Sequence, residues 1–291
     1  TSAQFAALST SQWLAMESND VAALSTNAIA ALTSSEITTL TSTFIGALTT
    51  EQVAALTTAQ VSRLSTQQID QLNADQIAAL STAAIVAPST DQVHNLSTQD
   101  FYSLTSAQIQ AMEAADVAVL TTSHIAVLSL DQAVGLTSTQ LAALSSTQLR
   151  ALSPDDVNVL TANAITGFTT DQIPLLTTDQ IIGFNTDQIE ALSANQIQHL
   201  TTDQIVALSA DQVQAFATDQ ILALTTTQFS AFELTDIAAL TTRQFAALET
   251  SDLACLSTDQ LAALTTAHLS ALTPGQLAAM TTHQLASLET A

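Results

Sequence analysis

The stretch TTDQIVAL, residues 201–208, contains the unit from which the whole chain is built. Cutting the sequence every eight residues from Thr1 gives 36 octads that end at Leu288, with no insertion or deletion. Position 5 of the octad is apolar in all 36, and position 8 is Leu in 28. This unbroken period predicts one continuous repeat domain over residues 1–291, because repeats of this kind stack on one another.

Each octad carries the sequence signals of a helix N-terminus. Position 1 is Ser or Thr in 29 octads and position 4 is Gln in 23, which is the spacing of a capping box. Pro154 and Pro274 both fall at position 2, the first helical position, where a missing N–H is tolerated. Asp at position 3, as in Asp203, suits the positive end of a helix. Leu at position 8 and Ile at position 5 have the spacing of a hydrophobic staple.

These signals predict an all-α fold, an α-solenoid of 36 consecutive short helices. One long helix is disfavoured because eight residues rotate by roughly 800°, so an apolar stripe would drift by about 80° per octad. A β-solenoid is the structural alternative, but the three-residue spacing of positions 5 and 8 and the five glycines favour helices. A single octad gains about 3–6 kcal/mol from its two apolar side chains, against about 8–16 kcal/mol of lost backbone entropy. Stacking must supply the difference.

The phenylalanines suggest how many octads make one turn. Eight of the nine occupy positions 5 or 8 of odd-numbered octads, namely Phe5, Phe101, Phe168, Phe184, Phe216, Phe229, Phe232 and Phe245. Phe44 falls at position 4, and Trp13 breaks the parity. We therefore expect two short helices, or 16 residues, per turn. Thirty-six octads would then stack as 18 layers into a rod of about 150–180 Å.

Irregular octads and the two ends raise further expectations. Pro88 replaces the position-8 Leu and predicts a local kink, and Pro174 at position 6 should cost one helical hydrogen bond. The chain starts in register without a visible signal peptide and ends in a partial octad at 289–291. Neither end has the polar capping repeat that solenoids usually need. We expect an excerpt of a longer array, with end-to-end stacking of subunits as the alternative.

The charge of the chain excludes several classes of partner. It carries 26 acidic residues against three cationic ones, all arginine, for a net charge of −23. Nucleic-acid binding needs the opposite sign, and so does adhesion to anionic membranes. Ser or Thr interrupts the sequence too often for a membrane-inserted stretch of about 20 apolar residues.

The candidate chemical groups favour no enzyme, cofactor or metal site. The histidines, His94, His124, His199, His268 and His283, occupy scattered octad positions. His268 and His283 are the one pair that a 16-residue coil would bring together as metal ligands. Apart from that possibility, we expect all five to be tolerated surface substitutions; His124 and His268 replace the capping Gln and can still offer a hydrogen bond.

Carboxylates, the single cysteine and the hydroxyls also have structural interpretations. The carboxylates fit helix capping, with weak calcium binding as an alternative. Cys255 fits a small buried residue. No catalytic motif is present, so we assign no catalytic or cofactor-binding residue. Position-2 threonines such as Thr202 could form an exposed ladder for glycan or ice, although Leu130 and Leu234 interrupt it.

The runs LTTDQIVALSADQVQAF (200–216) and ALTTEQVAALTTAQV (47–61) resemble octad arrays of very large secreted proteins of Gram-negative bacteria, described as adhesin-like or as haem-utilisation or adhesion proteins. The resemblance covers the whole chain and implies an extracellular location, with secretion signals outside this segment. It transfers no ligand residue. We therefore predict a structural spacer or stalk of a bacterial surface or matrix protein, whose partners are neighbouring repeats or copies of itself. The alternatives are a self-assembling filament and a surface that recognises glycan or ice.

Overall fold

The computed structural model describes residues 9–86 and 88–288. Every regular element in this part of the chain is a short helix, and it contains no strand, so the predicted α-solenoid is confirmed. Phe5 and the partial octad at 289–291 lie outside the described residues. The chain divides into two compact units, residues 1–151 and residues 152–291, and each is described separately. The prediction of one continuous domain stays a prediction.

The first unit consists of α-helices that follow the octads one by one. They are α2 (Thr10–Leu14), α3 (Ser18–Ala22), α4 (Thr26–Ala30), α5 (Ser34–Thr39), α6 (Ser42–Gly46), α7 (Thr50–Ala54), α8 (Thr58–Val61), α9 (Thr66–Ile69), α10 (Ala74–Ala79), α11 (Thr82–Ile85), α12 (Thr90–His94), α13 (Thr98–Tyr102), α14 (Ser106–Ala111), α15 (Ala114–Val119), α16 (Thr122–Ala126), α17 (Leu130–Val134), α18 (Ser138–Ala143) and α19 (Ser146–Ala151).

The second unit repeats this plan, with one 3-10 turn among its helices. Its elements are α20 (Pro154–Val159), α21 (Ala162–Ile165), η1 (Ile173–Leu175), α22 (Thr178–Gly183), α23 (Thr186–Ala191), α24 (Ala194–Gln198), α25 (Thr202–Val206), α26 (Ala210–Gln214), α27 (Thr218–Ala223), α28 (Thr226–Ser230), α29 (Leu234–Ala239), α30 (Thr242–Ala247), α31 (Thr250–Cys255), α32 (Thr258–Ala262), α33 (Thr266–Ala271), α34 (Pro274–Ala279) and α35 (Thr282–Leu288).

The octad register predicts where these helices begin. In α25 the N-cap is Thr201, with extended backbone at φ −74° and ψ 161°, and its side chain accepts from the N–H of Gln204. Pro154 and Pro274 are the first residues of α20 and α34, as expected. Pro174 lies inside the 3-10 turn η1, where the missing N–H replaces a full α-helical turn by a tighter one. Helix α11 ends at Ile85, ahead of Pro88.

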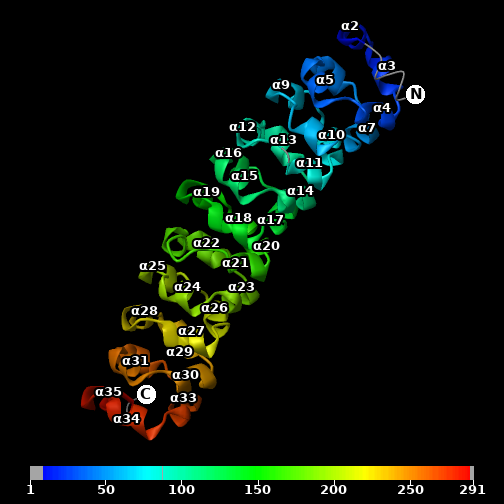
Figure 1. Ribbon diagram of the computed structural model, residues 1–291. Helices are drawn as coiled ribbons and strands as arrows, with labels where there is room; N and C mark the ends of the chain where they lie inside the picture. The colour runs from blue at the N-terminus through cyan, green and yellow to red at the C-terminus, as the bar shows by residue number, and fades with distance from the viewer. Residues whose placement is uncertain (1–8, 87, 289–291) are drawn as a thin grey trace. The chain divides into compact units, whose positions relative to one another are not determined.

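The helices of each unit stack in three columns, so one turn of the coil contains three octads. In the second unit, α22, α25, α28 and α31 pack in succession along one side, and α23, α26, α29 and α32 form the next column (Figure 1). In the first unit, α10, α13, α16 and α19 form such a column. The predicted 16-residue coil is therefore wrong, and so is the 18-layer stack derived from it. A spacing of three octads alternates odd and even octads within a column, so the parity of the phenylalanines does not define a row.

The core lies inside the three columns and is made by positions 5 and 8. Ile205 and Leu208 are 0% and 5% exposed, and the same positions are buried in nearly every described octad. Phe44, at position 4, is also buried, and its ring meets Trp13 edge-on at a centroid distance of 5.9 Å. At Gly183 a Cβ would lie 2.6 Å from the carbonyl oxygen of Pro154, so α22 approaches α20 more closely than alanine would allow.

Candidate functional site

The position-4 glutamines form the most regular polar feature of the structure, and we call them the glutamine ladder. The ladder residues are buried from Gln52 onward, as Gln204 is at 2% exposure. The Oε1 of Gln204 accepts from the backbone N–H of Thr201 at 2.8 Å, which completes the predicted capping box. Its Nε2 donates to the carbonyl oxygens of Ile173 and Leu176, both at 2.8 Å. One side chain thus caps its own helix and joins it to the octad four repeats earlier.

The same pair of acceptors recurs along the chain. Gln188 donates to the carbonyl oxygens of Val157 and Leu160, both at 2.7 Å, and Gln52 reaches Val21 and Leu24 in the first unit. Most ladder glutamines use positions 5 and 8 of the octad four repeats before, 31 and 28 residues earlier, whereas Gln76, Gln260 and Gln276 use position 6 in place of position 5. These carbonyls lie at a helix C-terminus, where position 5 accepts from the backbone N–H of position 8, as Ile173 does from Leu176, and the position-8 carbonyl lies beyond the helical bonds. The ladder therefore satisfies buried backbone groups in each turn of the coil.

Sequence reasoning found the capping role of position 4 and missed the second role. A capping box accepts Glu as well as Gln, yet Glu occurs at position 4 only at Glu36. A carboxylate cannot donate to carbonyls, whereas the amide can. The preference for Gln over Glu was the available signal for a donor function.

His124 and His268 take the place of ladder glutamines and are not surface substitutions as expected. Each is 3% exposed. In His268, Nδ1 accepts from the Thr265 N–H at 3.3 Å, and Nε2 lies 2.6 Å from the carbonyl oxygen of Leu240, 28 residues earlier. This arrangement requires the neutral ring with its proton on Nε2. The ring also stacks on Phe245 at a centroid distance of 5.1 Å.

The other histidines are exposed and do not form a cluster. His94 and His199 hydrogen-bond through Nδ1 to backbone carbonyls, and His283 is exposed on α35. His268 and His283, the one pair considered as metal ligands, are one buried, hydrogen-bonded ring and one exposed ring. Within residues 9–86 and 88–288, no group of three or more His, Cys, Asp or Glu side chains is arranged to hold a metal ion.

Carboxylates occupy two environments. Those at position 3, such as Asp179, Asp187 and Asp203, are exposed on the first helical turn, as the capping interpretation predicts. Those at position 4 are mostly buried, and Asp236 is 2% exposed. Burial raises the pKa of Asp236 to about 6; the hydrogen bond from the Glu233 N–H opposes this rise in pKa, and the nearby Glu233 charge adds to it.

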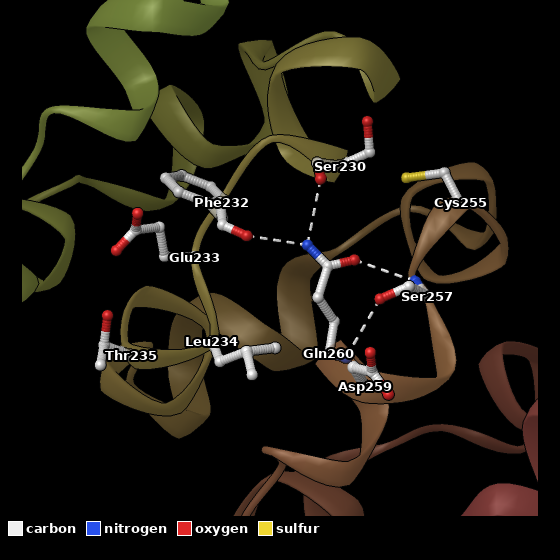
Figure 2. A pocket seen from close by; sticks show the side chains of 9 residues that line it. All are labelled: Ser230, Phe232, Glu233, Leu234, Thr235, Cys255, Ser257, Asp259 and Gln260. Carbon is white, nitrogen blue, oxygen red and sulfur yellow. Dashed lines mark hydrogen bonds between the residues drawn. The ribbon is translucent and has the colours of Figure 1, made fainter.

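The single cysteine lies beside a surface pocket of about 650 Å³ in the second unit (Figure 2). Cys255 is half-buried, not buried as expected, and its Sγ lies 3.0 Å from the carbonyl oxygen of Asp252. Burial raises the pKa of the thiol, and the Asp252 charge raises it further, so the reactive thiolate is disfavoured. Gln260 spans the pocket and donates to the carbonyl oxygens of Ser230 and Phe232 at 3.1 and 2.8 Å.

This pocket is a repeated feature of the coil and not a unique cavity. One wall is the junction between two octads, where Phe232 is position 8 of the first octad and Glu233 and Leu234 are positions 1 and 2 of the next. The other wall is made by positions 1, 3 and 4 of a later octad, Ser257, Asp259 and Gln260. The same positions line a pocket of about 440 Å³ in the first unit, which includes Ser106 and Asp131. Grooves at regular intervals therefore follow from the stacking geometry itself.

Threonines at position 2 line one side of the second unit. Four of them are exposed at the same position on successive helices of one column, namely Thr178, Thr202, Thr226 and Thr250 on α22, α25, α28 and α31. The expected ladder through Thr170, Thr178, Thr186 and Thr202 does not form as such, because Thr178 on α22 and Thr186 on α23 lie in different columns. Leu234 lies at position 2 on α29, in a neighbouring column, and is 49% exposed.

None of the helices in the described part of the chain is long and apolar enough to cross a membrane.

Comparison with known proteins identifies the repeat. The model of the ALTTAQ repeat matches residues 14–50, 45–82, 93–130, 109–146, 182–218, 229–266 and 258–290, which together make up more than half of the chain. The letters ALTTAQ themselves occur at residues 55–60. A comparison with curated proteins found no match. The matched segments fall in both units and follow the octads described above, and the chain is a member of the ALTTAQ repeat family.

Proposed function

We propose that the chain is a structural, non-enzymatic spacer or stalk segment of a bacterial surface or matrix protein, located outside the cell. The observation that carries this proposal is the glutamine ladder, exemplified by Gln204 and its two carbonyl acceptors. Because each octad with a ladder glutamine is joined to the fourth octad before it by bonds of the same kind, added octads lengthen the coil without a new kind of contact. Repeat number would then set length.

The polar surface supports the same function. The net charge of −23 is carried largely by exposed carboxylates such as Asp179 and Asp203. Similar chains would repel one another and stay separate and soluble. The mechanism needs neither a cofactor nor a reacting group, and the working partners are neighbouring repeats.

The proposal is tested by changing the number of octads in register. Removal of residues 185–256, nine whole octads or three turns, keeps every later glutamine in its register. We expect the maximum dimension in small-angle X-ray scattering to shorten by about 24–30 Å, at 8–10 Å per stacked helix. Removal of the four residues 203–206 is the control, because it breaks the register and should reduce the melting temperature. An unchanged maximum dimension after the nine-octad deletion would contradict the spacer.

The exposed threonine row favours recognition of a repetitive polymer such as a glycan, or of ice, as a second candidate. The replacement of Thr202 and Thr226 by valine keeps the shape of the row and removes two hydroxyls. Binding on a glycan array or thermal hysteresis that the double variant loses would support recognition over the spacer.

Fibres that lengthen with concentration in negative-stain images would instead support a filament, in which a second copy covers Leu277 and Leu285, 39% and 38% exposed.

A further inference from the structure

Glutamate at position 1 and aspartate at position 4 occur together. All four octads that begin with Glu have Asp at position 4, whereas only Asp100 and Asp156 occupy that position in the other 32 octads. The four pairs are Glu17/Asp20, Glu113/Asp116, Glu233/Asp236 and Glu249/Asp252. We call the last two, both in the second unit, the Glu–Asp boxes. Two carboxylates within one helical turn repel each other, so the joint occurrence of Glu at position 1 and Asp at position 4 needs a physical explanation.

The Glu–Asp boxes make the capping hydrogen bond of the ladder but not its long-range hydrogen bonds. The Glu233 N–H donates to Oδ2 of Asp236 at 3.1 Å, and the Glu249 N–H donates to Asp252 at the same distance. The N-cap amide is therefore satisfied, as it is by glutamine elsewhere. An ionised carboxylate, however, has no hydrogen to donate to the two carbonyls that lie 28 and 31 residues earlier.

The helices that pack against the helix of Asp236 carry no cation. Helix α29, which carries Asp236, packs against α26 and α32, whose charged residues are Asp211 and Asp259. The octad four repeats earlier, in which the Ile205 carbonyl accepts from the Leu208 N–H and the Leu208 carbonyl receives no ladder amide, contributes Asp203. All these groups and Glu233 are acidic, and Asp236 itself is 2% exposed.

Asp252 has a similar but less charged environment. Helix α31 packs against α28 and α34, neither of which carries a titratable side chain. Asp219 lies in the octad four repeats earlier, and Glu249 and Cys255 lie on or beside the helix of Asp252. Asp252 is 5% exposed. Both boxes thus hold a buried carboxylate that faces only negative or neutral groups.

We propose that protonation of the Asp in each Glu–Asp box stabilises the turn of the coil that contains it. When the Asp takes up one proton from solvent, its negative charge disappears, and its single new O–H can donate to one carbonyl of the octad four repeats earlier, where a ladder glutamine donates to two. The protonated box then holds its turn more firmly than the ionised box does. Acidification would tighten these turns, and neutral pH would leave them weaker than their neighbours.

The sign of the effect follows from linkage. The pKa values of Asp236 and Asp252 are raised in the folded chain, that of Asp236 from 3.8 to about 6, mainly by burial. The folded state therefore binds these protons more tightly than the unfolded state does. The resulting stabilisation is fully present below pH 3.8 and is lost as the pH rises through about 6.

The test compares the full chain with D236N/D252N, which cannot titrate and carries an amide donor. We expect the variant to melt higher than the wild type at pH 7.5. Lowering the pH to 5.0 should raise the wild-type melting temperature by about 3 °C or more beyond any rise in the variant. D179N/D187N is the matched control, because it removes two exposed position-3 charges, and it should keep the wild-type pH slope.

A second measurement follows the titration of the carboxyl group itself in the wild-type chain. Carbon-13 NMR of the aspartate carboxyls in the wild-type chain, with D236N used for assignment, should find Asp236 titrating near pH 6. Titration of Asp236 at the ordinary value near 4 would overturn the proposal. A pH slope of D236N/D252N equal to that of the wild type would also overturn it.

Discussion

The side-chain Nε2 of Gln204 lies 2.8 Å from the carbonyl oxygen of Leu176, a residue 28 positions earlier and one turn away in the coil. This bond is the long-range partner of a local one, since the Oε1 of the same amide caps helix α25. Both ends of the amide are buried, so neither bond can be exchanged for water without cost. The local start of each helix and the closure of each turn are thereby set by one side chain.

Replacement of Gln204 by alanine should lower the free energy of unfolding of the second unit by about 2–4 kcal/mol, because it removes the ladder bonds to the Leu176 and Ile173 carbonyls and the acceptor of the Thr201 N–H. Thermal unfolding followed by circular dichroism measures this loss. The control is Q198A, since Gln198 is exposed at position 6. Equal effects of the two substitutions would mean that the ladder bonds add nothing beyond helix propensity.

His268 should be replaceable by glutamine but not by leucine. H268Q keeps an acceptor for the Thr265 N–H and a donor for the Leu240 carbonyl, so we expect a change within about 1 kcal/mol. H268L removes both polar groups and should cost about 2–3 kcal/mol. Chemical denaturation of the two variants checks the order. If H268L were as stable as H268Q, the hydrogen bonds of this ring would not be needed.

Gly183 should reject the alanine that position 7 usually holds. A Cβ there would lie 2.6 Å from the Pro154 carbonyl oxygen, so G183A should destabilise the second unit by about 1–3 kcal/mol. Gly275 is the matched control, because its Cβ would meet nothing nearer than 4.0 Å. G275A should stabilise by about 0.5–1 kcal/mol through higher helix propensity. The melting temperatures of the two variants should therefore move in opposite directions.

Much of the local structure could be predicted from the octad itself. The N-cap at Thr201, the first-turn prolines 154 and 274 and the buried positions 5 and 8 all follow from short-range sequence signals. These signals act within one helix, so no knowledge of distant contacts is needed to interpret them. The surface location of Asp203 follows in the same way.

The number of octads per turn was decided only by the tertiary structure. Positions 5 and 8 face inward whether two or three helices surround the core, so the pattern of the repeat is compatible with both. Packing of α22 on α25 and of α25 on α28 fixes three columns. The long-range hydrogen bonds of Gln204 and His268 could not be predicted from the sequence for the same reason, because their acceptors become neighbours only when a turn closes. The sequence by itself determined each helix, its cap and its inward face, since these depend on contacts within eight residues. The coil, its buried carbonyls and the carboxyl pairs that face them depend on residues about 30 positions apart, and their proximity exists only in the stacked structure.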